Sequence, residues 1–179
     1  DNDRQFDGSP WPTLQAGVQF NASYKNFSLN LQLTGIFGNT LYDGVRQTLD
    51  GYALNNFRKD INPWSPTNPG GTDPRLYVND PSDPTISINN MAQTSRWLES
   101  GSYVRVRNIQ LGYAFPKSML STIGISNLQI YISGQNLVTL TKYKGMDPDV
   151  QGNGILQAGY DNGNWPDSRV LSIGLNCGF

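Results

Sequence analysis

A strict two-residue alternation constrains this chain more than any other feature of its sequence. In residues 13–24, all six even positions are apolar or aromatic, and none of the six odd positions is. The even positions hold Leu14, Ala16, Val18, Phe20, Ala22 and Tyr24. Because a strand directs alternate side chains to opposite faces, this segment has one apolar face and one polar face. A helix, with its repeat of 3.6 residues, would mix the two sets.

The same alternation returns four more times and predicts an all-β, antiparallel fold. The five predicted strands lie near residues 13–24, 27–42, 101–115, 127–141 and 169–179. Lys25-Asn26 predicts a two-residue hairpin in which Asn26 takes a positive φ. Val104 lies out of phase with Ile109, which predicts either a β-bulge or a stretch above the apolar zone.

Two long connections separate the strands. Residues 43–100 hold six of the eleven prolines, and residues 142–168 are rich in Gly, Asp and Asn. We expect both to be loops, the first with a short helix between Gly44 and Lys59. Loops of this length in a compact protein are usually functional.

The polar faces of the strands indicate a membrane barrel, since they carry Ser, Thr, Asn, Gln and Gly but few charges. Charged residues are 15% of the chain, against about 25% in an average soluble domain. Charge on a lipid-facing strand is costly, whereas a water-lined lumen accepts neutral polar groups. The alternating stretch within each segment is about 9–12 residues long, the span that a tilted transmembrane strand needs. The pattern therefore predicts an apolar face toward lipid and a polar face toward a lumen.

Aromatic residues fall at the same ends of the predicted strands. If the short Lys25-Asn26 turn is periplasmic, loops 43–100 and 142–168 are extracellular and the C-terminus is periplasmic. We then expect a membrane girdle at the periplasmic side, made of Tyr24, Phe27, Tyr113, Phe115 and Phe179. Five strands are too few to close a membrane barrel, and open edges in lipid leave backbone groups unpaired. The chain is therefore predicted to be a segment of a larger barrel.

Composition disfavours several other classes of protein. The chain has no histidine, a single cysteine at Cys177 and a net charge of −1. We therefore expect no enzyme, no metal site, no cofactor and no nucleic-acid partner. The alternative is a soluble carbohydrate-binding β-sandwich module, which would bury Leu31, Ile130 and Leu175 in one core.

Several segments of the sequence resemble those of a known family. The run Arg96–Pro116 (RWLESGSYVRVRNIQLGYAFP) resembles the C-terminal barrel motif of the SusC/RagA family of TonB-dependent outer-membrane importers. The block Leu128–Lys144, with its SGQNL core, and Met146-Asp147-Pro148-Asp149 resemble the segment that follows it. Trp165-Pro166 and the strand that ends at Phe179 resemble the family terminus, and residues 13–42 resemble the preceding hairpin.

The resemblance implies that residues 1–179 are the C-terminal part of a plugged barrel of about 22 strands. The family's plug and TonB-contacting segment lie N-terminal to this part and are not in this chain. The implied function is import of oligosaccharides or peptides across the Gram-negative outer membrane. The implied partners are the rest of the same barrel and its plug, a SusD-like surface lipoprotein, TonB and outer-membrane lipid.

Candidate site residues follow, each with an alternative role. Trp64, Trp97 and Tyr52 could stack on sugar rings or contact the lid, or could simply pack the loops. Arg105 and Arg107 could bind substrate at the mouth of the lumen, or pair with loop carboxylates.

Three further features are open to two interpretations. Phe179 is the candidate C-terminal insertion signal and otherwise only a girdle residue. Cys177 is expected to be a small lipid-facing residue. Asp147, Asp149 and Asp161 could suggest calcium, although their spacing matches no EF-hand loop and turn roles are favoured.

Overall fold

A computed structural model describes residue 5 and residues 7–51, 58–76, 92–121, 124–150 and 155–179. The chain divides into two compact units, each assembled from three stretches of sequence. The sheet unit consists of Pro12–Gly38, Gly101–Lys142 and Pro166–Phe179. The loop unit consists of Asp1–Trp11, Asn39–Ser100 and Tyr143–Trp165.

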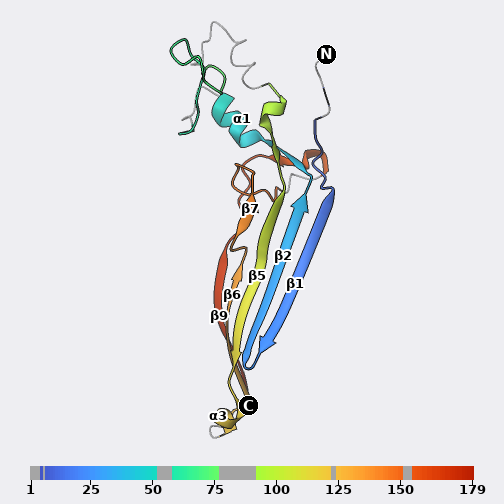
Figure 1. Ribbon diagram of the computed structural model, residues 1–179, viewed down its shortest axis with the longest axis vertical. Coiled ribbons are helices and arrows are strands. Elements are labelled where there is room, and N and C mark those ends of the chain that lie inside the picture. The colour runs from blue at the N-terminus through green and yellow to red at the C-terminus, as the bar shows by residue number, and fades with distance from the viewer. Residues whose placement is uncertain (1–4, 6, 52–57, 77–91, 122–123, 151–154) are drawn as a thin grey trace. The chain divides into compact units, whose positions relative to one another are not determined.

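The sheet unit is an antiparallel sheet built from the alternating segments. Its main strands lie side by side in the order β1-β2-β5-β6-β9 (Figure 1). Their bounds are β1 Leu14–Tyr24, β2 Phe27–Phe37, β5 Tyr103–Ala114, β6 Asn127–Gln135 and β9 Val170–Gly178. A short strand, β7 (Thr139–Thr141), pairs with β5, and the short helix α3 spans Lys117–Leu120. The sheet matches the predicted antiparallel order but does not close into a barrel.

The β1–β2 hairpin has the predicted two-residue turn, but the strained residue is not the one expected. Tyr24 pairs with Phe27, and the register then continues without a break to Leu14 and Phe37. Positive φ falls on Lys25, at 52°, and not on Asn26. The prediction for Asn26 was wrong because it rested on the residue type that best tolerates positive φ, whereas this turn has the positive φ at its first residue.

A β-bulge resolves the phase problem in β5. Gln32 pairs with Asn108 and Leu33 pairs with Val106, so Arg107 is the extra residue. The extra residue returns Val106 to the face that holds Ile109. The structure therefore confirms the bulge and not the alternative of a stretch above the apolar zone.

Two predicted strands end earlier than the alternation indicated. β2 stops at Phe37 because Gly38 has φ +80°, a conformation that favours glycine. The expected continuation to residue 42 is instead the separate strand β3 (Thr40–Asp43) of the loop unit. β6 stops at Gln135 because Asn136 also has a positive φ, at 52°. These boundaries depend on single backbone conformations that hydrophobic periodicity does not report.

The loop unit has secondary structure of its own, in segments predicted to be mainly loop. A second sheet has the order β4-β3-β8, with β4 at Leu98–Ser100 and β8 at Tyr160–Asp161. Helix α1 spans Gly44–Gly51, and the 3₁₀ helices η1 and η3 span Ser95–Trp97 and Ile155–Gln157. The helix predicted between residues 44 and 59 is therefore present, and the Asp43 carboxylate accepts a hydrogen bond from the Arg46 backbone N–H at its start. None of the helices in the described ranges has the length and apolar character needed to cross a membrane.

Candidate functional site

The apolar face of the sheet unit runs unbroken across all five main strands. Strand pairing places side chains from neighbouring strands on this face in rows, one of which is Leu29, Leu111, Ile132 and Ile173. The side chains of this face lie open to the surroundings, with Ile132 53% and Ile173 82% exposed. A sandwich core would bury them, yet Ile130 and Leu175 are 39% and 60% exposed. The observed exposure favours a lipid-facing surface over the β-sandwich alternative.

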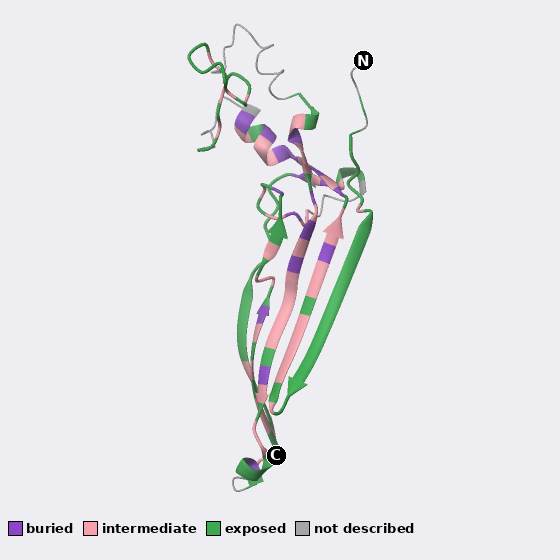
Figure 2. Ribbon diagram, viewed as in Figure 1, coloured by how far each residue is buried: buried purple, intermediate pink, exposed green. Residues whose placement is uncertain are grey.

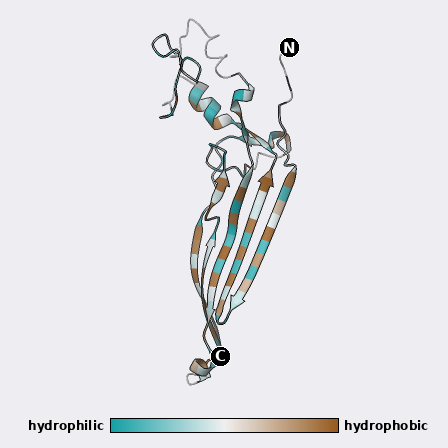
Figure 3. Ribbon diagram, in the orientation of Figure 1, coloured by the Kyte–Doolittle hydropathy of each residue, from teal (hydrophilic) through white to brown (hydrophobic). Residues whose placement is uncertain are grey.

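The opposite face of the same sheet carries rows of neutral polar side chains. One row consists of Asn21, Asn30, Gln110, Ser133 and Ser172, and the next of Gln19, Gln32, Asn108 and Gln135. Figure 3 shows the resulting alternation of hydrophilic and hydrophobic bands along each strand. Amides and hydroxyls both donate and accept hydrogen bonds, so this face can be wetted by water and can bind polar solutes.

The predicted girdle residues gather at one end of the sheet. Tyr24 pairs with Phe27 across the hairpin, and Phe27 pairs with Tyr113 on the next strand. The ring centroids of Phe27 and Tyr113 are 4.8 Å apart, and those of Tyr113 and Phe115 are 5.2 Å apart. Phe179 follows β9 at the same end and is 94% exposed. Tyr24, Phe27 and Phe179 are exposed, while Tyr113 and Phe115 are half-buried. Aromatic residues gathered at one level are typical of an interfacial girdle.

Arg105 and Arg107 share one carboxylate in the sheet unit. The Nη1 atom of each lies 2.8 Å from Oδ2 of Asp167. Arg105 is also only 1% exposed, and its Nε donates to Oγ1 of Thr139 at 2.9 Å. Of the two roles expected for these arginines, the geometry shows the pairing with a loop carboxylate. Asp167 thereby attaches the start of β9 to β5.

The candidate tryptophans of the loop unit differ in exposure. Trp97 is 1% exposed, its indole N–H donates to the Ala92 carbonyl at 3.0 Å, and the Arg96 guanidinium lies 4.6 Å from the ring centroid. This packing leaves the indole no open face within the unit. Trp64 is 42% exposed and keeps a surface that a ligand or lid could contact. Tyr52, the third candidate, lies outside the described residues.

Asp50 lies at the centre of a cluster of arginines in the loop unit, and the sequence alone did not identify it. Its carboxylate is buried and receives two hydrogen bonds from Arg58, at 2.8 Å and 3.0 Å. Arg46 and Arg96 approach the same carboxylate at 3.5 Å and 3.7 Å. The hydrogen bond to Asp50 raises the pKa of Arg58, while burial lowers the pKa of Arg96. In the sequence, only the i, i+4 spacing of Arg46 and Asp50 indicated that Asp50 could form an ion pair.

The aspartates suspected of binding calcium have structural partners instead. Oδ1 of Asp147 accepts the Asp149 backbone N–H at 2.9 Å, which is a local turn. Asp161 is 4% exposed and accepts a hydrogen bond from the Tyr143 hydroxyl at 2.5 Å. Within the described parts of the chain, no three side chains of His, Cys, Asp or Glu come together as metal ligands. The hydrogen bond between Asp147 and Asp149 fits the turn role.

Asp161 lies beside a second buried carboxyl group. Asp43 pairs with Asp161 in the parallel β3–β8 register and is 3% exposed. Burial raises the pKa of Asp43, and burial together with the bond to Asp161 raises the pKa of Tyr143. The Tyr143 phenol thus attaches β8 to the segment around residue 143, while β8 meets β3 through their parallel strand pairing.

These features define an antiparallel β-sheet with one apolar face and one face that carries mainly neutral polar side chains. No family model matches the chain. Over 99% of its length the chain is 34% identical to TonB-dependent receptor P3 of Formosa agariphila, and over 99% it is 23% identical to TonB-dependent receptor SusC of Bacteroides thetaiotaomicron. It spans only 17% and 16% of those two proteins.

Solved structures of the RagAB peptide importer have the same fold. The 'closed-closed' state matches 97% of the chain with a TM-score of 0.77 and 24% identity, and the 'open-open' state matches 98% with a TM-score of 0.75 and 26% identity. The chain covers 18% of each of those chains. It is homologous over nearly its whole length to the SusC/RagA-family TonB-dependent receptors, which confirms the resemblance in the sequence. These receptors are transporters and not enzymes.

Proposed function

We propose that this chain forms part of the barrel wall of a SusC/RagA-like importer that moves oligosaccharides or peptides across the Gram-negative outer membrane. The observation that carries the proposal is the two-faced sheet. Apolar side chains cover one face of the sheet across five strands. The polar rows on the other face contain only neutral side chains over the central part of the sheet. Lipid on one side and a watery lumen on the other require this division.

The edges of the sheet support a larger barrel around it. In the described residues, β1 pairs only with β2, and β9 pairs only with β6. Figure 2 shows β1 exposed along its full length, unlike the neighbouring β2 and β5. Unpaired strand edges in a bilayer leave backbone N–H and C=O groups without partners. The remaining strands and the plug of the same transporter would pair these edges and fill the lumen.

The proposed orientation and partners follow from the same arrangement. The tight Lys25-Asn26 turn and Phe179 lie at one end of the sheet, which we assign to the periplasm, with Phe179 as the insertion signal. The loop unit would then be extracellular, where a SusD-like lipoprotein could contact Trp64 and Tyr52. Energy would come from TonB through a segment outside this chain.

Thiol labelling in outer membranes tests the proposal. In the full-length protein that carries this chain, Cys177→Ser removes the exposed native thiol. Asn30→Cys and Leu31→Cys then place one new thiol on either face of β2. We expect a membrane-impermeant maleimide to label the Asn30→Cys variant and to spare the Leu31→Cys variant, because lipid covers only the apolar face.

Denatured samples supply the control, since both variants must react fully in urea. Equal labelling of the two variants in native membranes would contradict the proposed wall. So would recovery of the protein as a monomer in buffer without detergent, the behaviour expected of the β-sandwich alternative.

A further inference from the structure

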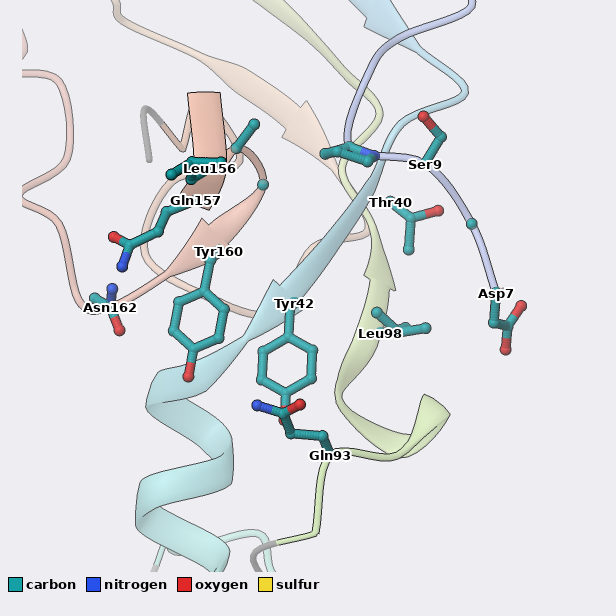
Figure 4. A pocket seen from close by; sticks show the side chains of 14 residues that line it. Asp7, Ser9, Thr40, Tyr42, Gln93, Leu98, Leu156, Gln157, Tyr160 and Asn162 are labelled. Carbon is teal, nitrogen blue, oxygen red and sulfur yellow. The ribbon is translucent and has the colours of Figure 1, made fainter. Parts of the chain in front are cut away.

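The loop unit contains an open cavity of about 440 Å³. Its walls come from residues 7–10, from β3, from Gln93 and Leu98, and from residues 156–162 (Figure 4). Gly8 has φ +89° and approaches Thr40 so closely that a Cβ would lie 2.7 Å from the Thr40 Cβ. Gly159 approaches Pro10 in the same way, with φ +75°. Two glycines at positive φ thus bring the walls together.

A pair of tyrosines lines the cavity. Tyr42 and Tyr160 are partners in the parallel β3–β8 register, and their rings stack with centroids 4.9 Å apart and planes 14° apart. Figure 4 shows the two rings lying parallel beside each other, with Gln93 near Tyr42. Gly44 makes room for this pair, because a Cβ there would lie 2.8 Å from the Tyr160 ring. The backbone pairing of β3 and β8 and the missing side chain at Gly44 therefore fix the positions of the two rings.

The Tyr42 hydroxyl is the unexplained group in this cavity. Its oxygen is buried and has no hydrogen-bond partner among the described residues. Burial, and after it the neighbouring Tyr160, raises the pKa of Tyr42 to about 12, so the phenol stays protonated and able to donate near neutral pH. Buried hydroxyls are nearly always paired, and an unpaired one lowers stability. Because this oxygen is closed to solvent, a ligand must displace a neighbouring side chain to bring a hydroxyl or ether oxygen to it as the missing acceptor.

The remaining polar groups of the cavity are neutral with one exception. They are the amides of Gln93, Gln157 and Asn162 and the hydroxyls of Ser9, Thr40 and Tyr160. Among the described residues that line the cavity, Asp7 is the only charged one, and none is Lys or Arg. A free peptide would leave its carboxylate uncompensated here, and an acidic sugar would meet the Asp7 carboxylate. Neutral hydroxyl-rich rings fit amides, hydroxyls and aromatic faces.

We propose that this cavity binds one unit of a neutral saccharide, with the Tyr42 hydroxyl as hydrogen-bond donor and the Tyr42–Tyr160 pair as its aromatic wall. The proposal deepens the proposed function, on which it rests, by naming a substrate class and a site for it. Asn162 and Gln157 extend the polar contacts on the Tyr160 side of the cavity, as Figure 4 shows.

Calorimetric titration of the full-length protein in detergent tests this site. The probes are maltotetraose, cellotetraose, xylotetraose and laminaritetraose, with tetra-alanine and tetragalacturonate as charged comparators. We expect at least one neutral tetrasaccharide to bind and both comparators to fail. Tyr160→Leu should weaken that binding more than tenfold, and Tyr42→Phe about fivefold to tenfold, the equivalent of one neutral hydrogen bond.

Tyr143→Phe is the matched control, because it removes a buried hydroxyl from the same unit outside this cavity. Its hydroxyl has a partner in Asp161, so this variant should lose stability and keep its affinity. Tyr42→Phe should do the opposite, keeping or gaining thermal stability while losing affinity. A purely structural role for Tyr42 would not produce that opposition.

The proposal fails if none of the four tetrasaccharides binds, if tetra-alanine or tetragalacturonate binds better, or if the Tyr42→Phe and Tyr160→Leu variants bind as the native protein does. Thiol labelling reports separately on the proposed function. Face-selective labelling with no effect of the cavity variants would overturn this inference alone. Saccharide binding by a protein without face-selective labelling would overturn the barrel proposal alone.

Discussion

The two units of this chain treat their polar groups in opposite ways. The sheet unit exposes its large apolar side chains and lines its other face with neutral amides and hydroxyls. The loop unit buries Leu41 and Trp97 and neutralises buried charge with charge, most clearly where Arg58 binds Asp50. The difference teaches that each unit suits the surroundings we propose for it: lipid and a watery lumen for the sheet, and water for the loops.

A charge placed on the apolar face should produce the largest effect. We expect Leu31→Arg in the full-length protein to destabilise the folded barrel by roughly 2–4 kcal/mol, because an arginine near the middle of the sheet would face hydrocarbon. The folded fraction in outer membranes can be read from the heat-modifiable mobility of the barrel on gels.

Gln32→Arg is the control, because it places the same charge on the next residue but on the polar face. This variant should fold nearly as the native protein does. If both variants fold equally well, the two faces of the sheet do not lie in different surroundings. That result would contradict the comparison between the two units.

Removal of one buried charge from the loop unit should have a smaller effect that stays local. Asp50→Asn keeps the shape of the side chain but leaves three arginines without their shared carboxylate. We expect a loss of roughly 2–3 kcal/mol, below the full cost of breaking a buried pair because the arginines remain partly exposed. Hydrogen exchange should rise in residues 39–51 and 92–100 and stay unchanged in the sheet unit.

Asp60→Asn is the matched control. Asp60 also pairs with Arg58, at 2.9 Å, but its side chain is 75% exposed to solvent. Exposed pairs contribute little, so exchange should hardly change in this variant. An equal response to the two substitutions would mean that burial does not determine how much these ion pairs contribute to stability.

The contrast between the units also explains how much the sequence could predict. Strand faces depend on a local period of two residues, so the five main strands and the placement of Leu175 and Ile173 on one face follow from the alternation alone. Strand ends depend on single dihedral angles, and the positive φ at Asn136 and at Lys25 leaves no periodic signal.

The loop unit could not be predicted in the same way because its contacts join distant residues. Arg46 meets Glu99 at 2.8 Å across 53 positions, and Tyr143 reaches Asp161 across 18. The stacked Tyr42 and Tyr160 are brought together only by a parallel pairing of two short strands. Residue type alone left Trp97 as either a ligand contact or a packing residue, and its burial depends on a fold that no local pattern indicates.

The smallest expected effect comes from one hydrogen bond in the loop unit, and it depends on pH. Tyr143→Phe removes the bond from the phenol to the Asp161 carboxylate, which should cost about 1.5 kcal/mol near neutral pH. The folded protein holds the pKa of Tyr143 above its ordinary value of 10. The unfolded chain therefore loses the phenol proton first, so the stabilisation is complete below pH 10 and declines as the pH rises beyond it. Thermal unfolding of both proteins from pH 8 to pH 11 should show the native advantage shrinking above pH 10. A difference that stays constant across this range would show that the Tyr143 hydroxyl is not held in its neutral, hydrogen-bonded form.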